Sequence, residues 1–168
     1  GTLFHMLARE EAFELRAMQA SGYDVVALGN HDFDLKPDGL ASMLRTGAEK
    51  GMPAVVCSNI EFSAADKRDA SLKQAFADGL IKPYLVLERS GLKIGVFALM
   101  GRHAAEDAPF ARPVRFGDPF KTAQSMVNML KSDEKVDLVI CLSHGGLDLD
   151  EAQQPKGDDV ELAKRVTG

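Results

Sequence analysis

Three short apolar runs in this chain each end abruptly in a tight polar turn, and this pattern most constrains the fold. Each run contains β-branched residues and is too short for a helix, which indicates a buried strand. Binding groups in α/β folds lie at the carboxyl ends of the strands, so such turns can converge on one cleft. The runs are residues 24–28, followed by Gly29-Asn30-His31; residues 54–57, followed by Ser58-Asn59; and residues 136–142, followed by Ser143-His144.

Amphipathic helices separate these strands. Apolar residues recur every three or four positions over residues 3–20 and again over 37–50, and a glycine follows each segment as a stop signal. Asp118 is placed to cap a third helix, and Asp158 or Asp159 to cap the last one. The alternation of strands and helices indicates βαβ crossovers.

A hairpin is expected in the middle of the chain, because the apolar runs 84–88 and 92–100 flank a turn that contains Gly91. Residues 61–78 are expected to form a surface excursion with a short helix, and residues 102–117 a loop. The order of elements therefore predicts an α/β protein, with a mixed sheet or two sheets sandwiched by helices.

Composition and charge exclude several classes of partner. Lys and Arg number 20 against 25 Asp and Glu, which gives a net charge of −5, so neither nucleic acid nor an anionic membrane is an expected partner. The longest apolar stretches fall far short of the roughly 20 residues that span a bilayer. Cys57 and Cys141 lie in strand-like runs and are expected to be buried, unreactive thiols. With no repeat and no linker, residues 1–168 are expected to form a single domain.

The turn after the first strand carries several side chains that can bind a metal ion or transfer a proton. Residues 29–34 offer an amide, an imidazole and two carboxylates. His31 and Asp34, three positions apart, can hydrogen-bond so that the carboxylate fixes the ring tautomer, which would make His31 a general acid. The alternative is that Asn30 and Asp32 only satisfy the backbone of the turn and His31 is a bystander, and this turn alone does not decide between them.

A second imidazole occupies the equivalent place after another strand. His144 follows the last apolar run, and two glycines behind it permit the close approach of a ligand. His5 and His103 are expected to be ordinary surface or packed histidines, and Asn59 to cap a strand end. No dinucleotide-binding glycine motif, P-loop, C-x-x-C or nucleophile elbow is present in the sequence.

Taken together, Gly-Asn-His-Asp-Phe-Asp after one strand and Ser-His-Gly-Gly after another resemble the motif pair of the calcineurin-like metallophosphoesterases. The 5′-nucleotidase and UDP-sugar hydrolase branch is the more similar one, because residues 57–60 and 91–96 also resemble it. The resemblance implies a four-layer α/β/β/α sandwich, here incomplete at both ends, that holds two divalent metal ions. It further implies hydrolysis of phosphate esters, either nucleotide 5′-phosphates or nucleotide sugars, by hydroxide held between the metals.

The resemblance also gives four candidate site residues. Asn30 and His144 resemble two ligands of the second metal ion. His31 and Asp34 resemble the catalytic His-Asp dyad, which stabilises charge on the phosphoryl group and assists the leaving group. Asp32 stands where the family has Asp or Glu and is given a supporting role. Nitrogen and oxygen ligands suit Zn, Mn, Co or Mg, and no residue is assigned to substrate binding.

The chain also departs from the family pattern. The motifs Asp-x-His, Gly-Asp and Gly-His-x-His, which supply the other metal ligands, have no counterpart in residues 1–168. We therefore expect the middle of a catalytic domain that by itself binds metal weakly and catalyses little. The resemblance implies a further C-terminal domain that recognises the small phosphate ester or nucleotide, and a periplasmic or secreted location. The alternative is a non-catalytic binding module that keeps the fold.

Overall fold

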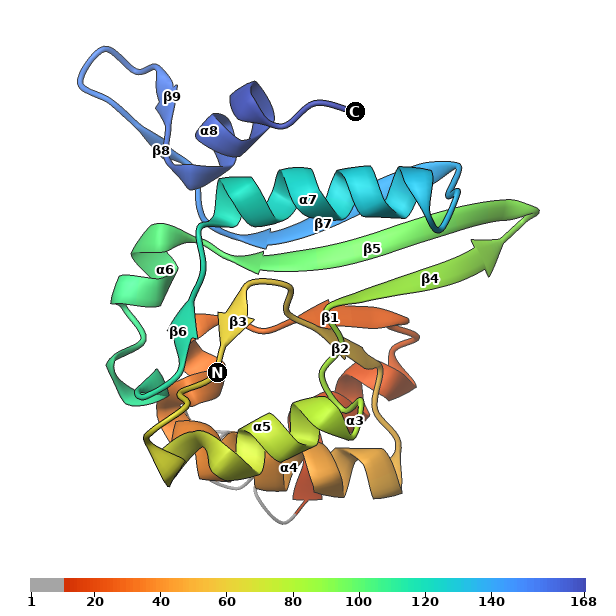
Figure 1. The fold of residues 1–168 in the computed structure, drawn as a ribbon, viewed down its shortest axis with the longest axis vertical. Helices are drawn as coiled ribbons and strands as arrows, with labels where there is room; N and C mark the ends of the chain where they lie inside the picture. The colour runs from red at the N-terminus through yellow and green to blue at the C-terminus, as the bar shows by residue number, and fades with distance from the viewer. Residues whose placement is uncertain (1–10) are drawn as a thin grey trace.

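The computed structural model describes residues 11–168 (Figure 1). The first part of the predicted helix over residues 3–20 lies outside the described residues, and the described part forms α3 (Phe13–Ala20). Leu15 is the buried residue of α3 and anchors the helix to the core. Ala12, directly before it, has a left-handed backbone with φ 45°. The described helix thus starts after a break in the chain direction.

The first two strands form a parallel pair joined by a helical crossover. β1 (Val25–Ala27) pairs with β2 (Ala54–Val56), and between them run η1 (Asn30–Leu35) and α4 (Lys36–Lys50). The predicted helix over 37–50 is confirmed, and its apolar face is fully buried. A buried leucine side chain contributes about 1.5–3 kcal/mol, so this face ties the crossover firmly to the core.

A second sheet carries the predicted hairpin. β4 (Tyr84–Arg89) runs antiparallel to β5 (Leu92–Met100), and β5 runs parallel to β7 (Leu138–His144). The hairpin is confirmed, and both of its turn residues have positive φ angles, as a tight two-residue turn requires. The register places His144 opposite Met100, so the imidazole stands at the carboxyl end of the sheet.

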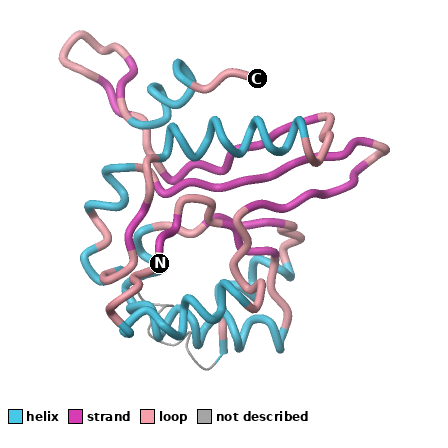
Figure 2. Tube along the Cα trace, in the orientation of Figure 1, coloured by secondary structure: helices cyan, strands magenta, loops and turns pink. Residues whose placement is uncertain are grey.

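The elements stack in four layers (Figures 1 and 2). α4 and α5 (Ala70–Ala77) cover the β1–β2 pair, the sheet β4-β5-β7 lies next, and α7 (Pro119–Ser132) covers its outer face. One apolar cluster fills the space around α4, and a second lies between the three-stranded sheet and α7. The predicted α/β/β/α arrangement is confirmed.

Several short elements complete the described chain. The expected surface excursion holds β3 (Ile60–Glu61) and η2 (Lys67–Asp69) before α5, and α5 buries Leu72 against the core. The prediction of a plain loop over 102–117 is wrong, because this segment folds as α6 (Arg102–Glu106), η3 (Pro109–Ala111) and β6 (Arg115–Phe116). β6 pairs with β3. β8 (Asp148–Leu149) and β9 (Pro155–Lys156) form a small exposed hairpin.

The two predicted helix caps have different outcomes. Asp118 caps α7 as expected, because its carboxylate accepts the backbone N–H groups of Phe120 and Lys121 at 2.9 and 3.0 Å. The prediction of an aspartate cap for α8 (Asp158–Arg165) is wrong: the cap position is Gly157, which has no side chain. The neighbouring aspartates bind other elements instead. No helix within residues 11–168 is both long and apolar enough to cross a bilayer.

The two cysteines are free thiols, as expected. Cys57 is 1% exposed and Cys141 is partly buried. Burial raises the pKa of both thiols to about 12, and the charge of Asp159 adds to the effect at Cys141. Both thiols are therefore protonated and unreactive at neutral pH.

Candidate active site

Two of the three polar turns meet at the carboxyl ends of β1 and β7. The side-chain Oδ1 of Asn30 lies 2.8 Å from Nε2 of His144, although the two residues are 114 positions apart in sequence. The two strands belong to different sheets, so the contact joins the two halves of the sandwich. The predicted convergence is confirmed for these two turns.

Gly29 lets the imidazole of His144 come this close. A Cβ atom on Gly29 would lie 2.8 Å from Cε1 and 3.0 Å from Nε2 of that ring, which is closer than real Cβ contacts allow. The φ angle of Gly29 is −115°, so the glycine is needed for space and not for an unusual backbone. Its backbone N–H donates to Oδ2 of Asp32 at 2.7 Å, and this bond closes the first turn of η1. Asp32 thus supports the turn that carries Asn30.

The His31–Asp34 pair stands beside this contact, on the same short helix. Nδ1 of His31 lies 2.9 Å from Oδ2 of Asp34, and the side chains are 59% and 33% exposed. Phe33, between them in sequence, is fully buried and packs edge-on against Phe116 with ring centroids 5.5 Å apart. The buried phenyl ring anchors η1, so that its polar neighbours face solvent from a fixed backbone. Since Nδ1 is bonded to the carboxylate, Nε2 of His31 remains available to a ligand.

A cavity of about 600 Å³ opens in front of these residues. Its polar wall consists of Asn30, His31, Asp32 and His144. The rest of the lining comes mainly from α3 and the residues after it. It is mostly apolar, with Phe13 and Tyr23 about half exposed, and it also includes Glu14 and Ser21. A pocket with a few converging polar groups on one side and apolar surface on the other has the general form of a small-molecule site.

α6 approaches the same site from a third direction. Nδ2 of Asn30 donates weakly, at 3.4 Å, to the backbone carbonyl of Asp107 at the end of α6. The amide oxygen of Asn30 is thereby directed toward His144. Sequence reasoning treated this segment as a loop and did not find the contact, because no motif marks a backbone carbonyl.

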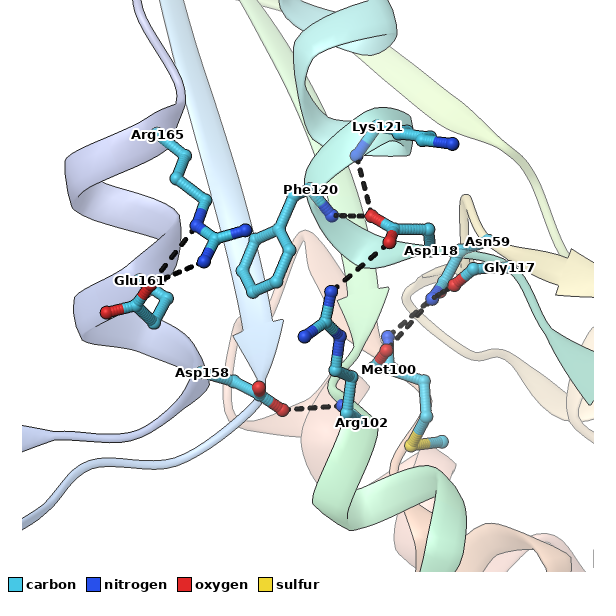
Figure 3. A network of polar contacts seen from close by, with 10 residues as sticks. All are labelled: Asn59, Met100, Arg102, Gly117, Asp118, Phe120, Lys121, Asp158, Glu161 and Arg165. Carbon is cyan, nitrogen blue, oxygen red and sulfur yellow. Dashed lines mark hydrogen bonds and ion pairs between the residues drawn. The ribbon is translucent and has the colours of Figure 1, made fainter.

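The Ser58–Asn59 turn does not join the site, so the expected convergence is wrong for this third turn. Asn59 is 3% exposed, and its amide bonds to the backbone of Met100 and Gly117 (Figure 3). It fastens the end of β5 to the segment that follows β6. The expectation that Asn59 caps a strand end is confirmed.

The donor atoms of Asn30 and His144 fit a shared divalent cation. Two ligands about 2.1 Å from one ion and at a right angle to each other are about 3 Å apart, close to the 2.8 Å between Oδ1 and Nε2. An amide oxygen and an imidazole nitrogen suit Zn²⁺, Mn²⁺ or Mg²⁺ to differing degrees. Within residues 11–168, no three His, Cys, Asp or Glu side chains gather into a metal cluster. Asn30 and His144 thus form a pair of donor atoms at this place in the described chain.

Comparisons with known proteins point to one group of enzymes, although no protein-family model matches the chain. The chain is 31% identical to the trifunctional nucleotide phosphoesterase protein YfkN of Bacillus subtilis, over 92% of its own length and 11% of that protein. It is 32% identical to an apyrase of Tabanus yao, over 96% of its own length and 26% of the apyrase. The chain thus spans between about a tenth and a quarter of the length of these relatives.

Solved structures agree with the sequence comparison. The 5′-nucleotidase precursor of Thermus thermophilus superposes with a TM-score of 0.64 and 29% identity, over 84% of this chain and 25% of that one. The calcineurin-like phosphoesterase YfkN of Bacillus subtilis superposes with a TM-score of 0.62 and 23% identity, over 90% of this chain and 44% of that one, which supports the fold alone. By sequence and by fold, the chain is a homologue of the 5′-nucleotidases and related calcineurin-like phosphoesterases, the family that its motifs resemble.

Proposed function

We propose that this chain is part of the catalytic domain of a metal-dependent phosphoesterase that hydrolyses nucleotide 5′-phosphates or nucleotide sugars. The observation that carries the proposal is the meeting of Asn30 and His144 at 2.8 Å, beside the His31–Asp34 pair and at the edge of one cavity. A metal donor pair and an oriented imidazole at one cavity are the parts that phosphoryl transfer needs.

Each of the four residues has a proposed role. Asn30 and His144 bind one of two divalent cations, which when present supply a hydroxide nucleophile and neutralise charge on the phosphoryl oxygens. Asp34 holds the ring of His31 through Nδ1, so that Nε2 carries a proton toward the phosphoryl group or the leaving-group oxygen. A geometrically fixed general acid contributes about 10²- to 10⁴-fold to a rate.

The substrate class comes from the relatives. The names nucleotide phosphoesterase, apyrase and 5′-nucleotidase all describe action on nucleotides. Because the chain spans only 11% and 26% of the first two of these proteins, we propose that the remaining metal ligands and a substrate-recognition domain lie on other parts of the full protein. We propose a periplasmic or secreted location on the family resemblance.

Phosphatase activity tests the proposal. The full-length gene product that contains this chain, its His31→Ala variant and the 168-residue chain alone are assayed with an aryl phosphate and with AMP, with Mn²⁺, Zn²⁺, Co²⁺ or Mg²⁺ added in turn. We expect metal-dependent hydrolysis by the full-length protein, a fall of about 10²-fold or more on losing His31, and little activity from the isolated chain.

The alternative, a non-catalytic binding module, predicts a different pattern. In that case the full-length protein is inert with every metal and substrate, while nucleotide still binds in calorimetry. Full activity of the His31→Ala variant would instead leave the phosphoesterase function intact and remove the proposed role of the dyad.

A further inference from the structure

The carboxylate of Asp159 bonds to the chain on both sides of His144. Oδ1 of Asp159 accepts the hydroxyl of Ser143 at 2.5 Å, and Oδ2 accepts the backbone N–H of Gly146 at 3.1 Å. The backbone N–H of Asp159 in turn donates to the carbonyl of Gly146 at 3.3 Å. Residue 143 lies before the imidazole and residue 146 after it, so the carboxylate bridges the turn that presents His144. Both carboxylate oxygens thus bond to the turn that presents His144, and through these bonds Asp159 can fix the position of that turn.

The preceding aspartate ties the same turn to α6. Asp158 is 8% exposed, and its Oδ2 accepts the backbone N–H of Arg102 at 2.5 Å (Figure 3). The backbone N–H of Gly101 donates to the carbonyl of His144 at 3.0 Å. A Cβ on Gly145 would lie 2.6 Å from Oδ1 of Asp159, so the backbone of the turn lies directly against the carboxylate. The start of α8 therefore holds the His144 turn between β7 and α6.

Arginine side chains from α6 and α8 pack on one aromatic ring of α7. The guanidinium groups of Arg102 and Arg165 lie over the ring of Phe120, at 4.4 and 4.8 Å from its centroid. Arg165 also pairs with Glu161 on the same helix (Figure 3). Each cation over an aromatic ring contributes about 0.5–1 kcal/mol at an exposed site. These contacts join α8 to α6 and α7, which fixes the helix that carries Asp159.

We propose that Asp159 is a positioning residue for metal binding: its carboxylate fixes the turn so that Nε2 of His144 faces Oδ1 of Asn30. This inference rests on the proposed function, since it assumes that these two atoms bind a cation. The ring also lies against Gly29, where a Cβ would be 2.8 Å from Cε1 and 3.0 Å from Nε2, so little space remains for the ring to move toward that residue. Partners that orient a metal ligand in this way typically change metal affinity by about 10- to 100-fold when removed.

Metal titration of the full-length protein tests the inference. Mn²⁺ binding is measured by calorimetry, and the Mn²⁺ concentration for half-maximal hydrolysis of AMP is measured in parallel. For Asp159→Ala we expect the Kd for Mn²⁺ and the Mn²⁺ concentration for half-maximal hydrolysis to rise about 10- to 100-fold. We expect kcat at saturating Mn²⁺ to be nearly unchanged. Asp159→Asn is expected to lie between this variant and the wild type, because an amide oxygen replaces only one of the two acceptors.

A second pair of variants tests the Ser143–Asp159 bond if the Asp159 variants fold poorly. Ser143→Ala removes one of the two bonds and is expected to weaken Mn²⁺ binding, whereas Ser143→Thr keeps the hydroxyl and is expected to restore it. Asp148→Asn is the charge-matched control, because Asp148 has a side chain that is 77% exposed and lies on the outer hairpin.

The outcomes separate this inference from the proposed function. A lower melting temperature with unchanged Mn²⁺ affinity in both Asp159→Ala and Ser143→Ala would overturn the positioning role and leave only a structural one. If His144→Ala itself leaves Mn²⁺ affinity unchanged, the proposed metal ligands are wrong, and the fault lies with the proposed function.

Discussion

Two asparagines follow the paired strands β1 and β2, and the structure uses them in opposite ways. Asn59 is 3% exposed, and its side-chain amide makes three hydrogen bonds to backbone groups at 2.9–3.0 Å. Asn30 is less buried and faces a cavity, with its oxygen against His144 and only a long 3.4 Å bond from its nitrogen. The first amide bonds to backbone groups, and the oxygen of the second bonds to the imidazole of His144 at the edge of the cavity.

The difference shows how to separate a structural polar turn from a functional one. A buried polar group must have its bonds satisfied within the protein, because leaving one unmade costs about 1–3 kcal/mol. A group at a cavity can instead complete its bonding with a ligand. The same residue type thus serves the fold at Asn59 and, in the function proposed above, binding at Asn30, and four predictions test this division.

The largest effect is expected in the functional turn. His31→Ala should reduce kcat for AMP by about 10²- to 10⁴-fold in the full-length protein. It should hardly change the free energy of unfolding, since the side chain is 59% exposed and its ion pair with Asp34 lies at the surface. His103→Ala is the control, because the side chain of that histidine is 75% exposed and its ion pair with Glu106 is long, at 3.8 Å. Equal activity losses in the two variants would contradict the division.

The buried turn should show the reverse behaviour. Asn59→Ala leaves three backbone groups without their partner, so the free energy of unfolding should fall by about 3 kcal/mol. Asn30→Ala should change it little but abolish most activity. Urea denaturation of both variants, with kcat measured on the fraction that remains folded, gives the comparison. The division fails if Asn59→Ala is as stable as the wild type.

A smaller effect is expected from a single methyl group at the functional turn. In Gly29→Ala the added Cβ would lie 2.8 Å from Cε1 of His144, so the ring must move, while the φ angle of −115° suits alanine. A displacement of about 1 Å at a catalytic group can cost about 10²-fold in rate, so we expect a fall of that order in activity with little change in stability. In a His144→Ala background the same methyl group should have almost no further effect, and additive losses would show that Gly29 acts through another residue.

Local sequence signals predicted the elements well and the tertiary partners poorly. The helix over 37–50, the hairpin and the Asp118 cap follow from periodicity, a turn glycine and a cap residue, which are all short-range features. The three polar turns looked alike in sequence, but whether each one reaches the site depends on packing between the two sheets. Burial and long-range contacts decide which turn reaches the site, and a local sequence pattern shows neither of them.

The same limit explains the error at the last helix. Asp158 and Asp159 were expected to cap α8, because aspartate next to the first turn of a helix usually does so. Both carboxylates instead accept hydrogen bonds from Arg102 on α6 and from Ser143 and Gly146 around the end of β7, all more than 10 positions away in sequence. A cap residue can serve any nearby N–H group, and only the tertiary structure shows which one is nearest.

The smallest effect concerns the alkylation rates of the two thiols, Cys57 next to the buried turn and Cys141 on β7. Cys57 directly precedes the buried turn, and burial raises its pKa from 9.0 to about 12, so only about one part in ten thousand is thiolate at pH 8. Alkylation by iodoacetamide at pH 8 should therefore wait for the turn to open, and Asn59→Ala should speed labelling of Cys57 but not of Cys141 on β7. The same raised pKa adds stability at every pH below about 9, and this contribution is lost between about pH 9 and 12, where the unfolded thiol ionises and the folded one does not. Equal labelling rates for Cys57 in the wild type and in Asn59→Ala would mean that the buried amide does not hold this turn closed, and the contrast between the two asparagines would then rest on activity alone.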